Sequence, residues 1–194
     1  MAEKKKWSLR QGITVDNSLL VSGALAAPAA ALANTFANSL TFAAVFSAVT
    51  FISLIISSFV PKGLPYALRI IMYCFTSAIV YMPVYTLLDG RLPSTIAKLG
   101  VFAPMIVTSS FIISASELRF FRMKRSRMIA DIISHIIGYD IIIILLGYFR
   151  ELFSLGGIGN QLYGVSLNIP GLAAPYAGFI LIGLLAAAVR LFDK

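Results

Sequence analysis

The 194-residue sequence has few charged residues and one cysteine, and each scarcity excludes a class of protein. Charged residues make up 12% of the chain, whereas soluble domains carry about 25%. With 59% hydrophobic residues and a mean hydropathy of +0.89, the chain is expected to be an all-α integral membrane protein. One cysteine, Cys74, excludes an internal disulfide and a metal site with several cysteines of this chain, and we expect it to be a small buried hydrophobic residue.

Apolar runs long enough to cross a membrane occur six times. A bilayer core of about 30 Å requires about 20 helical residues. We predict spanning helices at residues 18–35, 39–60, 65–88, 96–116, 128–149 and 172–192. Residues 1–17 would then be an N-terminal segment, and residues 18–194 a single membrane domain. The Gly-rich connection from Arg150 to Gly171 is expected to be irregular, with a short surface helix as an option at its start. Arg150 and Glu151 would anchor this start at the membrane interface, or pair with each other or with a partner.

The N-terminus also has features of a secretory signal peptide. Lys4, Lys5, Lys6 and Arg10 precede an apolar run that contains an Ala-x-Ala pattern, typical of a cleavage site, at residues 31–33. However, the polar lead is long, and residues 16–17, Asp and Asn, interrupt the step from charge to apolar run. We therefore favour a first spanning helix at this place.

The basic residues gather on one side of the predicted bundle. With the N-terminus in the cytoplasm, all of the 16 Lys and Arg except Arg91, Lys98 and Arg150 lie on the cytoplasmic side. This asymmetry follows the positive-inside rule, and it predicts a multi-pass protein of the inner (cytoplasmic) membrane with both termini in the cytoplasm. The net charge of +8 therefore indicates topology and no nucleic-acid partner; lipid or partner binding is the alternative for the loop between helices four and five. The basic residues of that loop are Arg119, Arg122, Lys124, Arg125 and Arg127.

Two stretches, AAPAAALANT at 26–35 and FAPMIVTSS at 102–110, share an Ala-Pro pair followed by a polar tail. They fall on helices one and four, so the two halves of the chain, about 18–88 and 96–192, would cross the membrane in opposite directions as inverted repeats. In such folds the broken helices of the two halves meet near the midplane and form the site. Ordinary proline kinks in two unrelated helices are the alternative. The candidate site residues of the two breaks are Pro28, Asn34, Pro104, Thr108, Ser109 and Ser110.

Ionisable residues on the fifth helix are further candidates, because a charge at bilayer depth costs about 2.5–3.5 kcal/mol. Asp131, His135 and Tyr139 follow one another at steps of four and share one stripe. Asp140 lies about 140° around the helix from His135, so these groups do not form a single relay. We interpret Asp140 as an ion or proton carrier, or as a polar lock to a neighbouring helix. His135 is expected to be a hydrogen-bonded packing residue, and Asp131 to lie partly solvated at the cytoplasmic edge.

Several motifs, taken in order, resemble one family. They are LGVFAPMIVTSSFI at 99–112, the Glu117 that follows, GYFRELFSLGGI at 147–158 and APYAGFILIGLLAAAVR at 174–190. The spacing from Asp131 to Arg150, with Gly138 and Tyr139 between them, is similar too. From about residue 19 to 191, the chain resembles the paired six-helix subunits of the Rnf complex and of the sodium-translocating NADH:quinone reductase (Nqr), in particular the E subunit of Rnf and the D subunit of Nqr.

The resemblance implies a membrane subunit of an ion-translocating electron-transport complex. It also implies a 2Fe-2S cluster between two such subunits, held by cysteines on helices one and four. Here the matching positions are Ala27 and Ser110, and neither a methyl group nor a neutral hydroxyl can replace a thiolate. We therefore expect no cofactor in this chain, and a scaffold or ion path in place of a catalytic role. The implied partners are a homologous six-helix subunit of opposite orientation, other membrane subunits and the lipid bilayer.

Two other functions stay open. The sequence contains no nucleotide fingerprint, flavin attachment site or haem ligand pair, so it does not describe a complete enzyme. A diverged secondary transporter or permease component could keep the inverted-repeat fold without electron transfer. A purely structural assembly partner is the third reading, and for that protein Asp140 would be dispensable.

Overall fold

The computed structural model describes residues 17–61, 63–91, 93–118, 125–158, 161–162 and 169–192. Within these residues the secondary structure is helical, except for a short antiparallel pair of two-residue strands, β1 (Gly157–Ile158) and β2 (Gln161–Leu162). Most of the N-terminal segment lies outside the described residues, and so do Arg119, Arg122 and Lys124 of the basic loop. Arg125 and Arg127 begin the long helix α8 (Arg125–Leu155).

Among the described residues, four stretches of helix are long and apolar enough to cross a membrane. They are α4 (Phe36–Ser57), α5 (Tyr66–Asp89), the composite Ile96–Glu117 and residues Arg127–Leu155 of α8. A shorter apolar helix, Pro175–Leu191, lies within α9 (Pro175–Phe192). The all-helical, multi-pass membrane architecture is therefore confirmed, whereas six spans arranged as inverted repeats remain a prediction.

The first predicted span consists of two short helices, α2 (Ser18–Ser22) and α3 (Ala26–Leu32). Between them Gly23 (φ 63°) and Leu25 (φ 55°) adopt left-handed conformations, which interrupt a right-handed helix. The chain then turns at Thr35, whose hydroxyl accepts a hydrogen bond from Asn38 N (3.2 Å) and caps α4. The break thus precedes Pro28 and does not occur at the proline itself.

The fourth predicted span is divided as well. It contains α6 (Pro93–Leu99), the 3-10 helix η1 (Gly100–Ile106) and α7 (Ser110–Leu118). Gly100 has a positive φ of 46°, and Pro104 lies inside the 3-10 segment, where its carbonyl accepts from Val107 N (3.0 Å). Each of the two predicted breaks therefore has a left-handed residue ahead of its proline.

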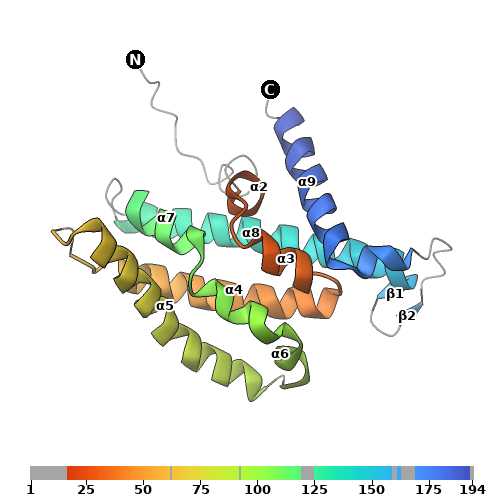
Figure 1. The fold of residues 1–194 in the computed structure, drawn as a ribbon, viewed down its shortest axis with the longest axis horizontal. Helices are drawn as coiled ribbons and strands as arrows, with labels where there is room; N and C mark the ends of the chain where they lie inside the picture. The colour runs from red at the N-terminus through yellow and green to blue at the C-terminus, as the bar shows by residue number, and fades with distance from the viewer. Residues whose placement is uncertain are drawn as a thin grey trace.

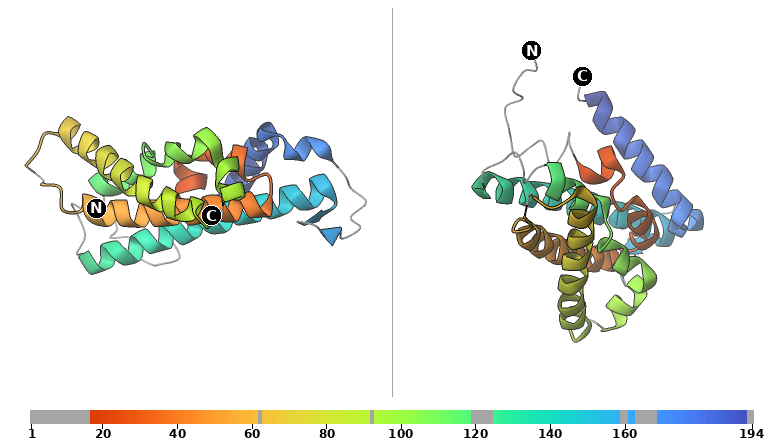
Figure 2. Two further views of the ribbon diagram at one scale, coloured as in Figure 1. Left: turned by 90° about the horizontal axis from the view of Figure 1, so that it is seen from below. Right: turned by 60° about the vertical axis from the view of Figure 1, so that its left-hand side comes forward.

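Helices α4 and α8 lie side by side and form the centre of the molecule (Figures 1 and 2). They approach closely at Gly147, where an added Cβ would fall 1.8 Å from Ser39 Oγ. Helix α5 packs on α4 and presents large apolar side chains such as Phe75 and Met82 at the surface, as a membrane helix does. Cys74 on α5 is partly exposed and not buried as expected.

Helix α8 continues past the predicted end at residue 149 and reaches Leu155. The start of the connection is helical, as the sequence allowed, but this helix is the continuation of α8, and Arg150 and Glu151 are buried and not at the surface. After the β1–β2 pair, the 3-10 helix η2 (Pro170–Ala173) leads into α9, which packs against α3.

Candidate functional site

The two breaks meet at one cavity of about 280 Å³. The first break supplies the backbone and small side chains of residues 23 and 25–28, and the second supplies Met105 and three hydroxyl residues. The lining residues are Gly23, Leu25, Ala26, Ala27, Pro28, Met105, Thr108, Ser109 and Ser110. Two segments about 80 residues apart in the sequence are thus joined at a single site, as α3 and η1 pack together.

The cavity contains oxygen donors and no thiol. Ala27 and Ser110 both line it, and they present a methyl group and a hydroxyl. Ser109, 3% exposed, accepts a hydrogen bond from Ile112 N (3.3 Å) and so helps to begin α7. Because iron–sulfur clusters are held by thiolates, these side chains do not fit such a cluster. Among the described residues there is also no group of three or more His, Cys, Asp and Glu placed to hold a metal ion.

Three of the predicted site residues lie elsewhere. Asn34 accepts a hydrogen bond from the side-chain amide of Asn38 (2.9 Å), in the turn between α3 and α4. Pro104 lies in η1 outside the cavity lining. Asp140 lies on α8, where the Ser47 hydroxyl of α4 donates to its Oδ2. The structure therefore combines Pro28, Thr108, Ser109 and Ser110 in one site and places Asp140 in another.

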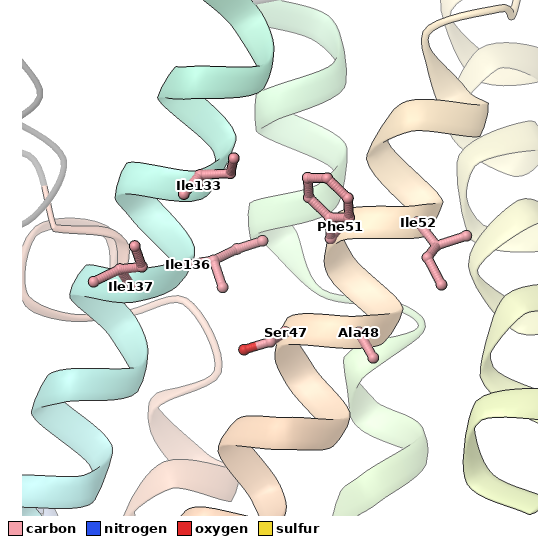
Figure 3. A pocket seen from close by; sticks show the side chains of 7 residues that line it. All are labelled: Ser47, Ala48, Phe51, Ile52, Ile133, Ile136 and Ile137. Atoms are coloured by element: carbon pink, nitrogen blue, oxygen red, sulfur yellow. The ribbon is translucent and has the colours of Figure 1, made fainter. Parts of the chain in front are cut away.

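Asp140 is partly buried, and its second oxygen, Oδ1, has no hydrogen-bond partner among the described residues. Its partner Ser47 forms the polar edge of a second cavity, of about 310 Å³, between α4 and α8 (Figure 3). The rest of that lining is apolar, and it consists of Ala48, Phe51, Ile52, Ile133, Ile136 and Ile137. The Ser47 bond ties α8 to α4 and leaves one carboxylate oxygen for a further ligand.

The stripe Asp131, His135 and Tyr139 faces the interior. Asp131 (8% exposed) and His135 (2% exposed) place Oδ1 and Nε2 3.8 Å apart, so Asp131 is more buried than expected. Tyr139 is fully buried, and its ring is tilted by 35° against that of Phe46, with 4.0 Å between the ring centroids. Its hydroxyl donates to Leu25 O (3.4 Å). This last bond links α8 to the break of the first span.

Arg150 makes a set of buried hydrogen bonds that the sequence did not predict. It is fully buried, and its guanidinium donates five hydrogen bonds of 2.7–3.0 Å to backbone carbonyls. Neighbouring Glu151 accepts from Phe36 N (2.7 Å), the first residue of α4. An Arg-Glu pair at a helix end was the available signal, but its partners lie far away in the chain. They are the carbonyls of Ala30, Ala33, Leu172, Ala173 and Ala174.

A second ionic centre joins α5 to α7. Glu117 accepts from Arg69 Nε and Nη2 (both 2.8 Å) and from the Tyr73 hydroxyl (2.9 Å). Arg69 also donates from Nη1 to Leu64 O (2.8 Å), in the loop that follows α4. All of these groups belong to one end of the bundle, and their bidentate geometry gives a strong, oriented contact. The centre is a structural link between the two halves of the chain.

Comparison with known proteins gives a consistent family. The family model described as "Rnf-Nqr subunit, membrane protein" matches residues 6–193. The E subunit of the proton-translocating ferredoxin:NAD(+) oxidoreductase complex of Clostridium ljungdahlii is 25% identical, over 98% of this chain and 91% of its own. The D subunit of the Na(+)-translocating NADH-quinone reductase of Pseudomonas paraeruginosa is 29% identical, over 71% of this chain and 65% of its own.

A third relative, the E subunit of the Na(+)-translocating ferredoxin:NAD(+) oxidoreductase complex of Acetobacterium woodii, is 27% identical over 66% of this chain and 67% of its own. These matches to E and D subunits agree with the resemblance carried by the sequence motifs. Since the family model covers nearly the whole chain, the protein belongs to the Rnf-Nqr family of membrane subunits.

Proposed function

We propose that this chain is a membrane subunit of an Rnf/Nqr-like ion-translocating electron-transport complex, in which it supplies scaffold or an ion path and no iron–sulfur ligands of its own. Family membership and the names of the relatives support the complex. The relatives are subunits of proton- or Na(+)-translocating oxidoreductases. The absence of iron–sulfur ligands from this chain is proposed from its own side chains at residues 27 and 110.

One observation carries the second half of the proposal. Ala27 and Ser110, the positions at which the resembled subunits have cysteines, line the same cavity at the meeting of the two breaks. The fold thus keeps a place where two broken helices converge, and the side chains there lack the thiolates that a cluster needs. Electrons carried by the complex would then pass through centres held by other subunits.

The repeat and the partner belong to this proposal as well. Gly23 and Gly100, both with positive φ, precede Pro28 and Pro104, which supports two repeats of the same design. We infer six spans in two inverted halves, an inner-membrane location and cytoplasmic termini, in agreement with the distribution of Lys and Arg. A homologous subunit of opposite orientation would cover the shared cavity.

Iron analysis tests the proposal. The chain, purified together with its companion subunit, is expected to contain no stoichiometric iron and to give no 2Fe-2S EPR signal after reduction with dithionite. The double variant Ala27→Cys/Ser110→Cys is the matched comparison, because it restores both thiolates and should take up iron if the companion offers two more. Iron in the wild-type pair that disappears on Cys74→Ala would contradict the proposal.

A further inference from the structure

Two contacts fix how α4 and α8 are aligned. Phe36 N donates to Glu151 Oε2 (2.7 Å) near one end, and the Ser47 hydroxyl donates to Asp140 near the middle. Ser47 is eleven positions after Phe36, and Glu151 is eleven positions after Asp140. The helices are therefore antiparallel, and each step towards the end of α4 corresponds to one step towards the start of α8.

Beyond Ser47, this alignment places buried hydroxyls of α4 beside buried polar groups of α8. Thr50, Ser53 and Ser57 are at most 2% exposed, and their hydroxyls have no hydrogen-bond partner among the described residues. Ser53 falls at the level of Ser134, and Ser57 near the turn that contains Asp131. With Ser47, these hydroxyl residues recur at intervals of three or four and lie on one side of α4.

Other hydroxyls of the same helix behave differently. Ser39 and Thr41 donate to the carbonyls four residues before them, at 2.8 and 2.9 Å, which satisfies a hydroxyl within its own helix. The interior hydroxyls of α4 do not, and Ser77 of α5 and Ser116 of α7 share this property. A buried polar group without a hydrogen bond is costly inside a membrane. Water molecules that hydrogen-bond to these hydroxyls would remove that cost.

The ionisable groups of α8 lie along this set. Asp131 and His135 form a pair with 3.8 Å between Oδ1 and Nε2, and Asp140 has the unpartnered Oδ1. On α8 alone, His135 and Asp140 lie on different sides of the helix and are not connected. On the adjoining helix, the hydroxyl of Thr50 lies at a level between His135 and Asp140, and the hydroxyl of Ser53 lies one residue beyond His135, at the level of Ser134. Helix α4 therefore supplies hydroxyls that α8 lacks along this stretch.

We propose that the α4 hydroxyls Ser47, Thr50, Ser53 and Ser57, together with Asp131 and His135, line a hydrated track along which a proton reaches Asp140. Hydroxyl groups and water molecules can each donate and accept a hydrogen bond at the same time. Carboxylate and imidazole groups can take up a proton and release it again. The track starts where α4 ends and α8 begins, and it stops at a carboxyl half-way along α8. This track gives the ion path of the proposed function a location and a transported ion. Its role in the cell rests on the proposed function, whereas its hydration can be tested separately.

Access of water to the track is measurable without turnover. In membrane vesicles that contain the whole complex, Ser53→Cys and Thr50→Cys, each in a Cys74→Ser background, would be treated with Ag⁺ and then denatured and labelled with a maleimide. Val45→Cys is the matched control, because Val45 is fully buried on the same helix among apolar side chains. We expect Ag⁺ to block the two track cysteines about tenfold faster or more than the control, since close-packed apolar interiors exclude water. Equal rates at all three positions would overturn the proposal.

A second reagent tests the end of the track. Dicyclohexylcarbodiimide is lipid-soluble and reacts with protonated carboxyls, and the apolar cavity beside Ser47 gives it a way in (Figure 3). Mass spectrometry is expected to find the adduct on Asp140 and to find none in Asp140→Asn. A hydrated track with an unmodified Asp140 would show that the carboxyl does not hold a proton, and the proposal would be wrong. Because assembly of the complex is not measured, either failure leaves the proposed function itself intact.

Discussion

At the scale of single residues, Arg150 shows how a charge can be stabilised without a carboxylate bound to it. The guanidinium has five N–H donors, and each of the five bonds uses one of them. Ala30 and Ala33 contribute carbonyls at the end of α3, where the helix dipole is negative and favours a cation. One side chain therefore holds the broken first span, α8 and the approach to α9 together.

Arg150→Lys is expected to destabilise the protein although it keeps the charge. An ammonium group has three donors, so at least two buried carbonyls would lose their partner, at about 1–3 kcal/mol each. We expect a clear fall in the midpoint of thermal unfolding, measured by size-exclusion chromatography of heated, detergent-solubilised protein. Arg127→Lys, at an exposed position of the same helix, is the control and should melt within error of the wild type. Equal midpoints for both variants would show that the five bonds contribute little.

At the scale of elements, glycines decide how closely helices approach. An added Cβ at Gly178 of α9 would fall 2.6 Å from the carbonyl oxygen of Ala30, the same oxygen that Arg150 binds. At Gly183, one and a half turns further along, none of the described residues comes within 4 Å of the added atom. Gly178 is tightly packed and Gly183 is not, although both lie on α9. The same substitution at the two positions therefore isolates the effect of packing.

Opposite effects are therefore expected from the two Gly→Ala changes. Gly178→Ala must push α3 away from α9, and overpacking of this kind costs about 1–3 kcal/mol. Gly183→Ala meets open space and gains helix propensity, by up to about 1 kcal/mol. The same thermal assay should place the first variant below the wild type and the second at or above it. A Gly178→Ala protein with the wild-type unfolding midpoint would show that α3 and α9 can move apart without loss of stability.

Hydropathy predicted most of the elements, because a membrane span leaves a long apolar run in the sequence. It placed α4, α5, α8 and α9 within a few residues of their observed starts, and Ala-Pro marked both interrupted spans. Hydropathy did not predict the contacts that form between segments far apart in the sequence. Arg150 is helical and buried because carbonyls of residues 30–33 and 172–174 receive it, and Ser47 meets Asp140 through the alignment of two helices. No local pattern encodes such contacts.

At the scale of the whole molecule, the cavity at the two breaks lies at the surface of the chain. Met105, one of its lining residues, is 42% exposed, although it lies at the meeting point of two broken helices. Backbone at such a break needs protein or water as a neighbour, since lipid offers no hydrogen bonds. A companion subunit that covers this face would supply that neighbour.

The chain itself is a poor candidate for that companion. An inverted copy would have to insert in the opposite orientation, and each Lys or Arg in a short loop biases insertion. Of the 16 basic residues, all but Arg91, Lys98 and Arg150 lie on one side of the predicted topology, far from the balance that dual insertion needs. The companion is therefore expected to be a different polypeptide of similar length, with its basic loops on the other ends of its helices.

A photo-crosslinking amino acid at Met105 tests this arrangement in native membranes. Irradiation is expected to join the chain to one companion of similar mass, because Met105 lines the cavity that the companion would cover. Met82 is the control: it is 70% exposed on α5, which does not line the cavity, and it should not capture the same companion. Mass spectrometry of the product identifies the captured chain. A product that contains two copies of this chain, or capture of lipid alone at Met105, would contradict the pairing and favour a protein that works without such a subunit.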